Sequence, residues 1–470
     1  MAERSSLKMA MAGMISCSCG FALSNEAGNE LAKGEAQINL DSERLSILPK
    51  FAEAIHLSLV DITKILPVDY RVDMTLSSRE RISVSNLGYK FGDLVSNLFQ
   101  ARNEMILKYL LLNESIKKSG VWGDLSLTDS SSAARQFEGC EFRLYETSIV
   151  LIPTTEEPIR IHYSNVARIE AKDYSIAITT EIGERFIISK IGRELDSTSK
   201  ELSDAINTLN IQSQSLIKDL VPSADPTVVR SASRLLKDGK AARRSDIESV
   251  SPEVWRAFEK KLEQTPIWNG YQYLKSIGRE EKIAIGIKRG LMGDLTGNYL
   301  WVLIPIDNKN PEFGNAIALE TARILSSSPK DSEMADGIPP DADTAIATGG
   351  NATYFFRILS RKDYAGIGGN KNELDGKVDS MISRMNELML DINFRREPIF
   401  LSDEALQTEP KYARYKFAAG KIPSLKDLRQ RFIGRVIHSS SEQWKSNVLA
   451  LLSFNQSTID DNARWEKSEQ

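Results

Sequence analysis

The chain is poor in the two side chains that most often hold transition metals. It has 470 residues but only three cysteines, Cys17, Cys19 and Cys140, and only three histidines. An odd, low cysteine count excludes a disulfide framework and fits a reducing compartment. The "CSCG" sequence at 17–20 has the form of half a zinc ribbon, but a structural zinc site needs four ligands, and no second cysteine pair or close histidine pair exists. The sequence therefore predicts no metal site.

Long apolar runs are also missing, since no stretch approaches the roughly 18–20 residues that span a bilayer. Arg4 and Lys8 precede "MAMAGMISCSCGFAL", which has the outline of a secretory signal peptide. This segment is rich in Ala, Gly, Ser and Cys rather than Leu or Ile, and no A-x-A cleavage site follows it. We therefore expect a cytoplasmic protein, with export as the alternative, and an N-terminal segment over 1–33 outside the folded units.

Signatures of common enzyme classes are absent. The sequence contains no P-loop, no dinucleotide-binding G-x-G-x-x-G after a strand, no H-E-x-x-H and no G-x-S-x-G. The glycine-rich "GIGGNKN" at 366–372 lacks P-loop spacing and predicts a turn before a helix. His56 and His162 occupy the polar phase of alternating strands and are expected to face solvent, while His438 is expected to end a basic helix. The sequence predicts no catalytic residue and no cofactor, although folding can still assemble a pair of carboxylates.

Overall size and charge are those of an ordinary multidomain globular protein. The chain is 41% hydrophobic and 26% charged, with a net charge of −4. Its length predicts two to four domains. Because acidic and basic residues nearly balance, no global field attracts a polyanion, and any such site has to be local.

One sequence pattern occurs twice in the first half of the chain. Residues 45–88 align without a gap on residues 149–192, an offset of 104, with 11 identical pairs in 44 positions. Composition alone would give roughly three, so the match predicts a duplicated structural unit. The identical pairs include Asp69-Tyr70 with Asp173-Tyr174, and Gly88 with Gly192.

Each copy changes its hydrophobic period part-way along. Short runs with alternating apolar residues, such as Ile55, Leu57 and Leu59, predict half-buried antiparallel strands. After the glycine that both copies share, the apolar spacing becomes about 3.6 residues, which predicts one amphipathic helix. The first half is therefore expected to hold two antiparallel β-meander or barrel units, each closed by a C-terminal helix.

This order of strands, turn and helix resembles pleckstrin-homology-like units over about 34–115 and 135–220. The alternative is another small β-sheet with a packed helix. The resemblance implies binding of proteins or phosphoinositides. The basic cluster that lipid-binding members carry between their first two strands is missing, since Lys50 stands alone and 154–158 is the acidic "TTEEP". The departure favours protein contact over lipid binding.

The second half has a different pattern. Residues 221–251 predict a basic linker with one short helix, followed by a helix that starts at Ser251-Pro252. Strands are expected at 283–289, 298–306, 315–322 and 352–361, a long loop at 327–351, and helices at about 372–395 and 424–454. Ser424 and Asp427 resemble a capping box for the last helix. Residues 252–470 are therefore predicted to form a mixed α+β domain, and the whole chain belongs to the α+β class.

Two local stretches are basic. Residues 228–244 carry six cations, Arg230, Arg234, Lys237, Lys240, Arg243 and Arg244. Residues 411–435 interleave cations with aromatics, and the candidate binding residues there are Lys411, Arg414, Tyr415, Lys416, Lys426, Arg429, Arg431 and Arg435. Such a pattern suits phosphates and stacked bases, an anionic membrane or an acidic protein, or is simply the solvated side of a packed helix.

These observations favour a non-catalytic intracellular adaptor that binds proteins through its two repeated units, because repeated modules gain avidity without new chemistry. The alternative is a polyanion-binding protein that brings the two basic stretches together on nucleic acid or an anionic membrane. A third hypothesis places an enzyme site among the loops at 327–371, since long loops often carry function.

Overall fold

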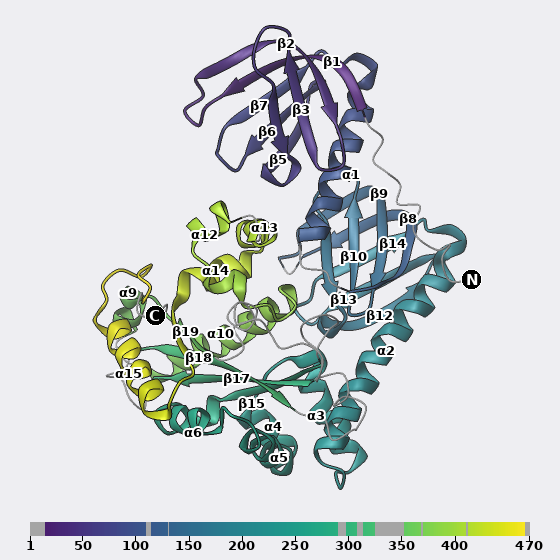
Figure 1. The fold of residues 1–470 in the computed structure, drawn as a ribbon. Coiled ribbons are helices and arrows are strands. Elements are labelled where there is room, and N and C mark those ends of the chain that lie inside the picture. The colour runs from purple at the N-terminus through teal and green to yellow at the C-terminus, as the bar shows by residue number, and fades with distance from the viewer. Residues whose placement is uncertain are drawn as a thin grey trace, which may run out of the picture. The chain divides into compact units, whose positions relative to one another are not determined.

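The computed structural model describes residues 15–109, 114–129, 131–289, 298–307, 314–324, 352–367, 370–409 and 412–465. The chain divides into two compact units, Met1–Ser203 and Asp204–Gln470 (Figure 1). Among the described residues, no helix is long and apolar enough to cross a bilayer.

The first repeat is one seven-stranded antiparallel sheet followed by a helix. Its elements are β1 (Ile15–Ser24), β2 (Glu30–Leu40), β3 (Arg44–Pro49), β4 (Ile55–Ser58), β5 (Ile62–Val68), β6 (Arg71–Leu76), β7 (Arg81–Ser85) and α1 (Phe91–Tyr109). The strand order in the sheet is β4-β3-β2-β1-β7-β6-β5. The order puts β4 and β5 at the two edges of the sheet.

The second repeat has the same element order. It consists of β8 (Ile116–Thr128), β9 (Ala134–Tyr145), β10 (Ser148–Pro153), β11 (Ile159–His162), β12 (Val166–Lys172), β13 (Ser175–Thr180), β14 (Arg185–Ser189) and α2 (Leu195–Leu220). From β3 to β7 every strand begins and ends 104 residues before its counterpart, and both repeats carry a register irregularity at the start of the matching edge strand, β5 or β12. The predicted fold class of this half, duplicated meanders closed by helices, is confirmed.

Backbone angles repeat as well. Positive φ occurs at six matched positions, 28 and 132, 69 and 173, 70 and 174, 79 and 183, 86 and 190, and 88 and 192. Only the last pair is glycine in both copies. A positive φ is costly for most other residues, so the shared angles show that the copies keep the same turns where the side chains have diverged.

The prediction that residues 1–33 lie outside the folded units is wrong from Ile15 onward. β1 has the sequence "ISCSCGFALS", in which Cys17, Cys19 and Phe21 alternate with less buried residues and enter the core. All three cysteines are free and buried. The "CSCG" segment is thus part of a strand that contributes to the core, and each repeat begins one strand earlier, with β1 or β8, than the units predicted from about 34 and 135.

Helix α1 packs against both sheets of the first unit. Leu94, Leu98 and Met105 join the core of the first repeat. Leu107 instead packs with Tyr145, Val150 and Ile152 of the second repeat. A helix buried on opposite faces joins the repeats into one body.

The second unit is built on a six-stranded antiparallel sheet in sequence order, from β15 to β20. Its strands are β15 (Ala242–Arg243), β16 (Ala284–Arg289), β17 (Asn298–Ile306), β18 (Ala316–Ile324), β19 (Ala352–Arg357) and β20 (Phe432–Ile437). The helices named below are α3 (Pro226–Leu235), α4 (Arg244–Val250), α5 (Pro252–Glu263), α6 (Trp268–Ile277), α9 (Arg361–Gly366), α10 (Lys371–Asp391), α11 (Glu397–Phe400), α12 (Asp403–Thr408), α13 (Ala413–Lys421), α14 (Pro423–Arg431) and α15 (Ser441–Ser457).

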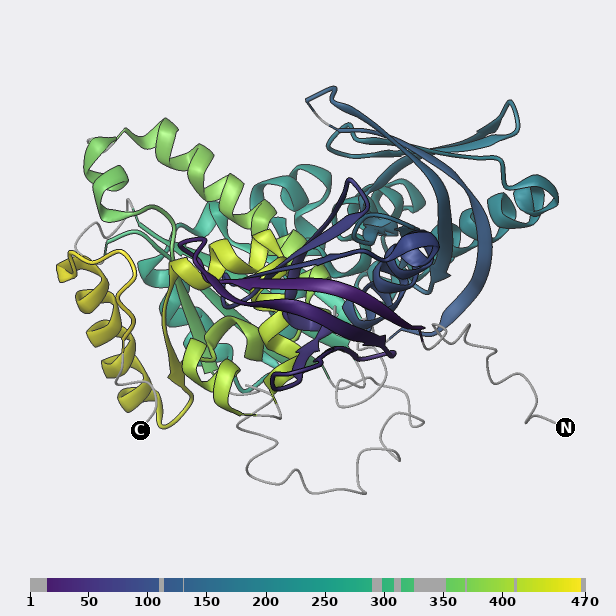
Figure 2. The same cartoon turned by 90° about the horizontal axis from the view of Figure 1, so that it is seen from above.

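Helices cover both faces of this sheet. Alternate residues of β17, including Leu300, Val302 and Ile304, share a core with α3 to α6 and α15. The intervening Trp301 packs edge-on against Phe394, which follows α10. Figure 1 shows α4, α5 and α6 on one side of the sheet and α10, α13 and α14 on the other, and α15 runs beside β20 in Figures 1 and 2. Because both faces are covered, the inner strands are nearly continuous apolar runs.

Three expectations for this half need correction. Residues 221–251 are not a linker, since they form α3, β15 and α4 and supply Val229, Ala232 and Ile247 to the core. The helix expected over 424–454 is interrupted by β20 between α14 and α15. The capping box is also wrong, because Ile422 precedes α14 without a side-chain cap and Ser424 bonds Asp391 instead. By contrast, Ser251 caps α5 as predicted.

Candidate functional site

The outer face of β5 carries an apolar row that is exposed. Leu66 is 44% and Val68 37% exposed, and Lys64 lies on the same face at one end of the row. We call Lys64, Leu66 and Val68 the β5 row. On the neighbouring strand, Asp73 stands opposite Leu66 and Arg71 opposite Val68. The row therefore presents two branched apolar side chains and one cation at the edge of the sheet.

The second repeat provides a direct comparison. The matching face of β12 carries Arg168, Glu170 and Lys172, and the side chains of Arg168 and Glu170 form an ion pair at 2.7 Å. Charged residues on edge strands are a common protection against unwanted association. The second repeat follows that rule, whereas the first repeat replaces two of the three charges with Leu66 and Val68.

A tyrosine ends this row in the turn between β5 and β6. Asp69 and Tyr70 have φ of 49° and 59°, and Asp173 and Tyr174 repeat this with 51° and 56°. Tyr70 is 76% exposed, and its ring centroid lies 5.5 Å from that of Phe91. Two-residue hairpins usually place Asn or Gly at such angles. The turn thus holds a large aromatic side chain in solvent beside the β5 row.

The first hairpin loop of each repeat carries no cation. In the observed fold the first hairpin loops are 25–29, "NEAGN", and 129–133, "DSSSA". Glu26 in the first loop pairs with Arg79 at 2.6 Å. The segments around Lys50 and 154–158, which the sequence pattern puts between the first two strands of each repeat, lie between the third and fourth strands in the structure. Each of the two hairpin loops contains one acidic residue, Glu26 or Asp129, and neither forms a basic cluster.

Several candidates in the basic 411–435 stretch make contacts inside the second unit. Tyr415 is 1% exposed. The buried Arg429 reaches the backbone oxygen of Pro398 and the carboxylate of Asp403. Arg431 bonds Asp427 and the backbone oxygen of Ile358. These guanidinium groups satisfy internal acceptors.

The remaining candidates lie in different settings. Lys416 and Lys426 are exposed on α13 and α14. The Arg435 guanidinium lies 4.1 Å from the centroid of the Phe400 ring. Arg414 lies in α13, and Lys411 lies outside the described residues. Phosphate binding by this set remains a prediction.

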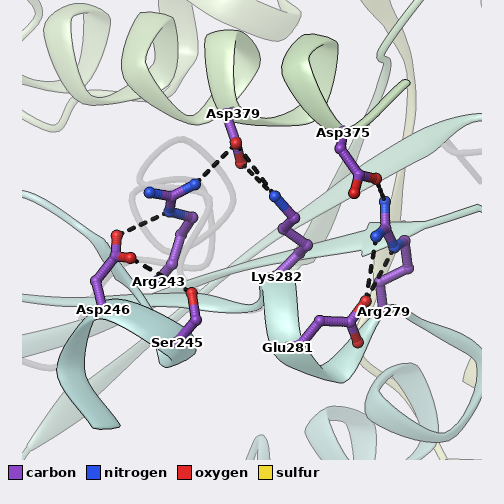
Figure 3. A network of polar contacts seen from close by, with 8 residues as sticks. All are labelled: Arg243, Ser245, Asp246, Arg279, Glu281, Lys282, Asp375 and Asp379. Carbon is purple, nitrogen blue, oxygen red and sulfur yellow. Dashed lines mark hydrogen bonds and ion pairs between the residues drawn. The ribbon is translucent and has the colours of Figure 1, made fainter. Parts of the chain in front are cut away.

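The other basic stretch is tied into a charge network that joins the sheet to α10. Figure 3 shows Arg243 between Asp246 and Asp379, both at 2.8 Å, and Lys282 on Asp379 at 3.0 Å. Arg279 bonds Asp375 of the same helix, and also Glu281. Nearby, Arg244 pairs with Glu248 and Glu280. Arg243 and Arg244 are thus neutralised by acids of their own unit, while Arg230 and Arg234 are exposed.

A buried acid in the second unit has a histidine partner. Glu320 of β18 is 2% exposed, and its Oε2 accepts hydrogen bonds from Thr353 at 2.5 Å and from His438 Nε2 at 3.0 Å. His438 stacks on Trp444 at 5.6 Å, and the Trp444 indole N–H donates to Thr353. His438 follows strand β20 rather than ending a helix, so its predicted setting is wrong.

The geometry does not build a nucleophile relay. Such a relay uses one imidazole nitrogen for the hydroxyl and the other for the acid. Here the same His438 Nε2 lies 3.3 Å from Thr353 Oγ1 and 3.0 Å from Glu320, and Thr353 is fully buried. The arrangement neutralises a buried carboxylate. Sequence reasoning missed it because Glu320, Thr353 and His438 are brought together only by the pairing of β18, β19 and β20.

We expect this pair to make the second unit less stable as pH rises. Burial by itself lowers the pKa of His438, but the hydrogen bond and charge of Glu320 outweigh burial and raise it. Because the folded pKa lies above the unfolded value of about 6.5, the contribution is complete below that pH and is lost as pH rises through the folded pKa. Urea unfolding at pH 6 and pH 8.5 should show the loss, and His438→Gln should remove it. An unchanged pH dependence in that variant contradicts the assignment.

The other histidines differ from each other. His56 is exposed on β4, as predicted. His162 is only 4% exposed, so its predicted solvent position is wrong. Within the described residues no group of three or more His, Cys, Asp or Glu could hold a metal ion. Of residues 327–371, which the enzyme hypothesis invokes, 327–351 lie outside the described residues, and 352–367 contain β19 and α9.

Comparisons with known proteins do not show a family for this chain. No protein-family model matches the chain, and no curated protein does. Among solved structures, the chain is similar to the N-terminal PH domain of human ARAP2 protein, with 14% identity, a TM-score of 0.17, and coverage of 22% of this chain and 90% of that one. It is also similar to the Spt16D Pob3N heterodimer, with 13% identity, a TM-score of 0.16, and coverage of 36% and 84%. The strand order and closing helix of both repeats are consistent with a pleckstrin-homology-like fold.

Proposed function

We propose that the protein is a non-catalytic adaptor and that its tandem pleckstrin-homology-like repeats bind another protein. The observation that carries the proposal is the difference between matched edge strands. Leu66 and Val68 are exposed in the first repeat where Glu170 and Lys172 stand in the second. Exposed apolar groups at a sheet edge invite association, and a duplicated charged version in the same chain indicates that the fold does not need them there.

The construction of the first unit suits this role. Because α1 packs on both sheets, the β5 row sits on a body formed by both repeats. A surface on a rigid scaffold loses little conformational entropy when a partner docks. The first hairpin loop of each repeat holds no basic cluster, which supports protein over phosphoinositide as the ligand.

Co-purification with a matched variant tests the proposal. The tagged full-length protein would be isolated from its own cells at low and high salt, with and without nuclease. We expect a defined protein to survive both treatments, and Leu66→Glu with Val68→Lys, which copies the second repeat, to reduce its recovery at least about tenfold, or about 1.4 kcal/mol of binding energy.

The control exchanges Glu170→Lys with Lys172→Glu, which leaves the net charge unchanged and should retain the partner. Recovery of nucleic acid that leaves with salt would instead favour the polyanion-binding alternative. A chain that carries no protein under either condition would contradict the adaptor role.

A further inference from the structure

The cation of the β5 row lacks the counter-ion that its counterpart has. In the second repeat Arg168 pairs with Glu170. The corresponding residues of the first repeat are Lys64 and Leu66, so the carboxylate is missing. Within the described part of the chain, Lys64 makes no ion pair or side-chain hydrogen bond.

The acid on the neighbouring strand is already occupied. Asp73 stands opposite Leu66 but bonds Arg71 at 2.8 Å and Ser83 at 2.6 Å. Lys64 therefore stands as an unneutralised ammonium beside two exposed apolar side chains. A docking partner that covers Leu66 and Val68 would also take Lys64 partly out of water, and an unpaired charge at an interface is costly.

We propose that the β5 row binds a partner-protein segment that presents apolar side chains next to a carboxylate, which pairs with Lys64. The inference rests on the proposed function and names the chemistry of its partner. Tyr70, exposed at the other end of the row, supplies the rigid aromatic surface that interfaces favour. Pro67 lies in β5 and has no N–H, which weakens recognition by addition of another strand. Recognition therefore depends on side chains.

The test places a photo-crosslinking benzoylphenylalanine at position 68 of the full-length protein in its own cells, and at position 172 as the matched control. We expect a crosslink to a partner protein at position 68 and at least about tenfold less at position 172. Mass spectrometry of the crosslinked peptide should find Asp or Glu within a few residues of an apolar attachment point.

Charge reversal then tests the pairing itself. Lys64→Glu should weaken binding of the identified partner about tenfold, and changing the partner's acid to lysine should restore it. Unchanged affinity in Lys64→Glu, or an attachment point without an acid, overturns the inferred chemistry. Crosslinking to a second copy of this chain or to lipid overturns it as well. If a partner co-purifies but never crosslinks at position 68, the site is wrong while the adaptor role stands. If no protein co-purifies, the proposed function itself fails.

Discussion

Replacing Glu114 by alanine should destabilise the first unit by about 3–5 kcal/mol, because it removes one partner of a buried ion pair. The Glu114 side chain is 0% and that of Arg160 8% exposed, and their atoms lie 2.7 Å apart. Glu114 also accepts hydrogen bonds from the backbone N–H and the hydroxyl of Thr147. The substitution leaves a buried guanidinium and a buried N–H without this acceptor.

Urea unfolding of the full-length protein measures the loss. Glu146→Ala is the matched control, because Glu146 is 34% exposed and pairs with Lys117 at the surface, where such a pair contributes about 0–1 kcal/mol. Glu114→Ala combined with Arg160→Met should recover part of the stability, since no buried charge is then left uncompensated. Equal losses of unfolding free energy for Glu114→Ala and Glu146→Ala would show that the buried pair contributes no more to stability than the surface pair.

Replacing Gly286 by alanine should destabilise the second unit by about 3 kcal/mol, through overpacking and a broken hydrogen bond. A Cβ atom at Gly286 would lie 2.4 Å from the indole nitrogen of Trp301 and 2.5 Å from the backbone oxygen of Gly239. These two atoms form a buried hydrogen bond of 2.6 Å. Because backbone and a packed indole surround the site, little can move aside.

Gly376 offers a control of opposite sign in the same unit. It lies in α10, and no atom outside its own helical turn stands within 4 Å of the position that an alanine methyl group would take. Gly376→Ala should therefore stabilise the unit by about 0.5–1 kcal/mol through helix propensity. Urea unfolding followed by tryptophan fluorescence distinguishes the two, and a neutral Gly286→Ala would contradict the packing described for β16 and β17.

The fold of the first half could be predicted only where the two repeats retain identical residues. From β3 to β7 the identities at Asp69-Tyr70 and Gly88 mark turns that need positive φ, so the duplicated strands could be aligned. Over 15–44 only Leu23 and Leu40 match their counterparts. The first two strands of each repeat diverged in sequence while keeping the fold, and "CSCG" was therefore not recognised as part of a strand.

The errors in the second half have a similar physical origin. Leu425, Leu428, Phe432 and Val436 have helical spacing, yet Phe432 and Val436 belong to β20. Pairing with β19 determines that these residues form a strand. The intrinsic strand propensity of so short a segment is too weak to determine this by itself. The cations of 411–435 were interpreted as a surface, but Arg429 and Arg431 find carbonyls and carboxylates that only the folded chain brings near.

The β5 row was not predicted, although its signal is present in the match between the repeats. Leu66 aligns with Glu170 and Val68 with Lys172 in the gapless match. The difference can be interpreted only when Leu66 and Val68 are known to be exposed on an edge strand whose counterpart in the second repeat is the edge strand β12. In a chain with two repeats, the surface of one repeat can thus be compared directly with the matching surface of the other.

Hydrogen–deuterium exchange on the native complex tests the central claim most directly, because the same molecule holds the site and its control. The partner should slow backbone exchange over 62–76, which contains β5 and β6, and leave the matched 166–180 unchanged. Equal protection of both segments, or protection elsewhere with none over 62–76, would contradict docking on the β5 row.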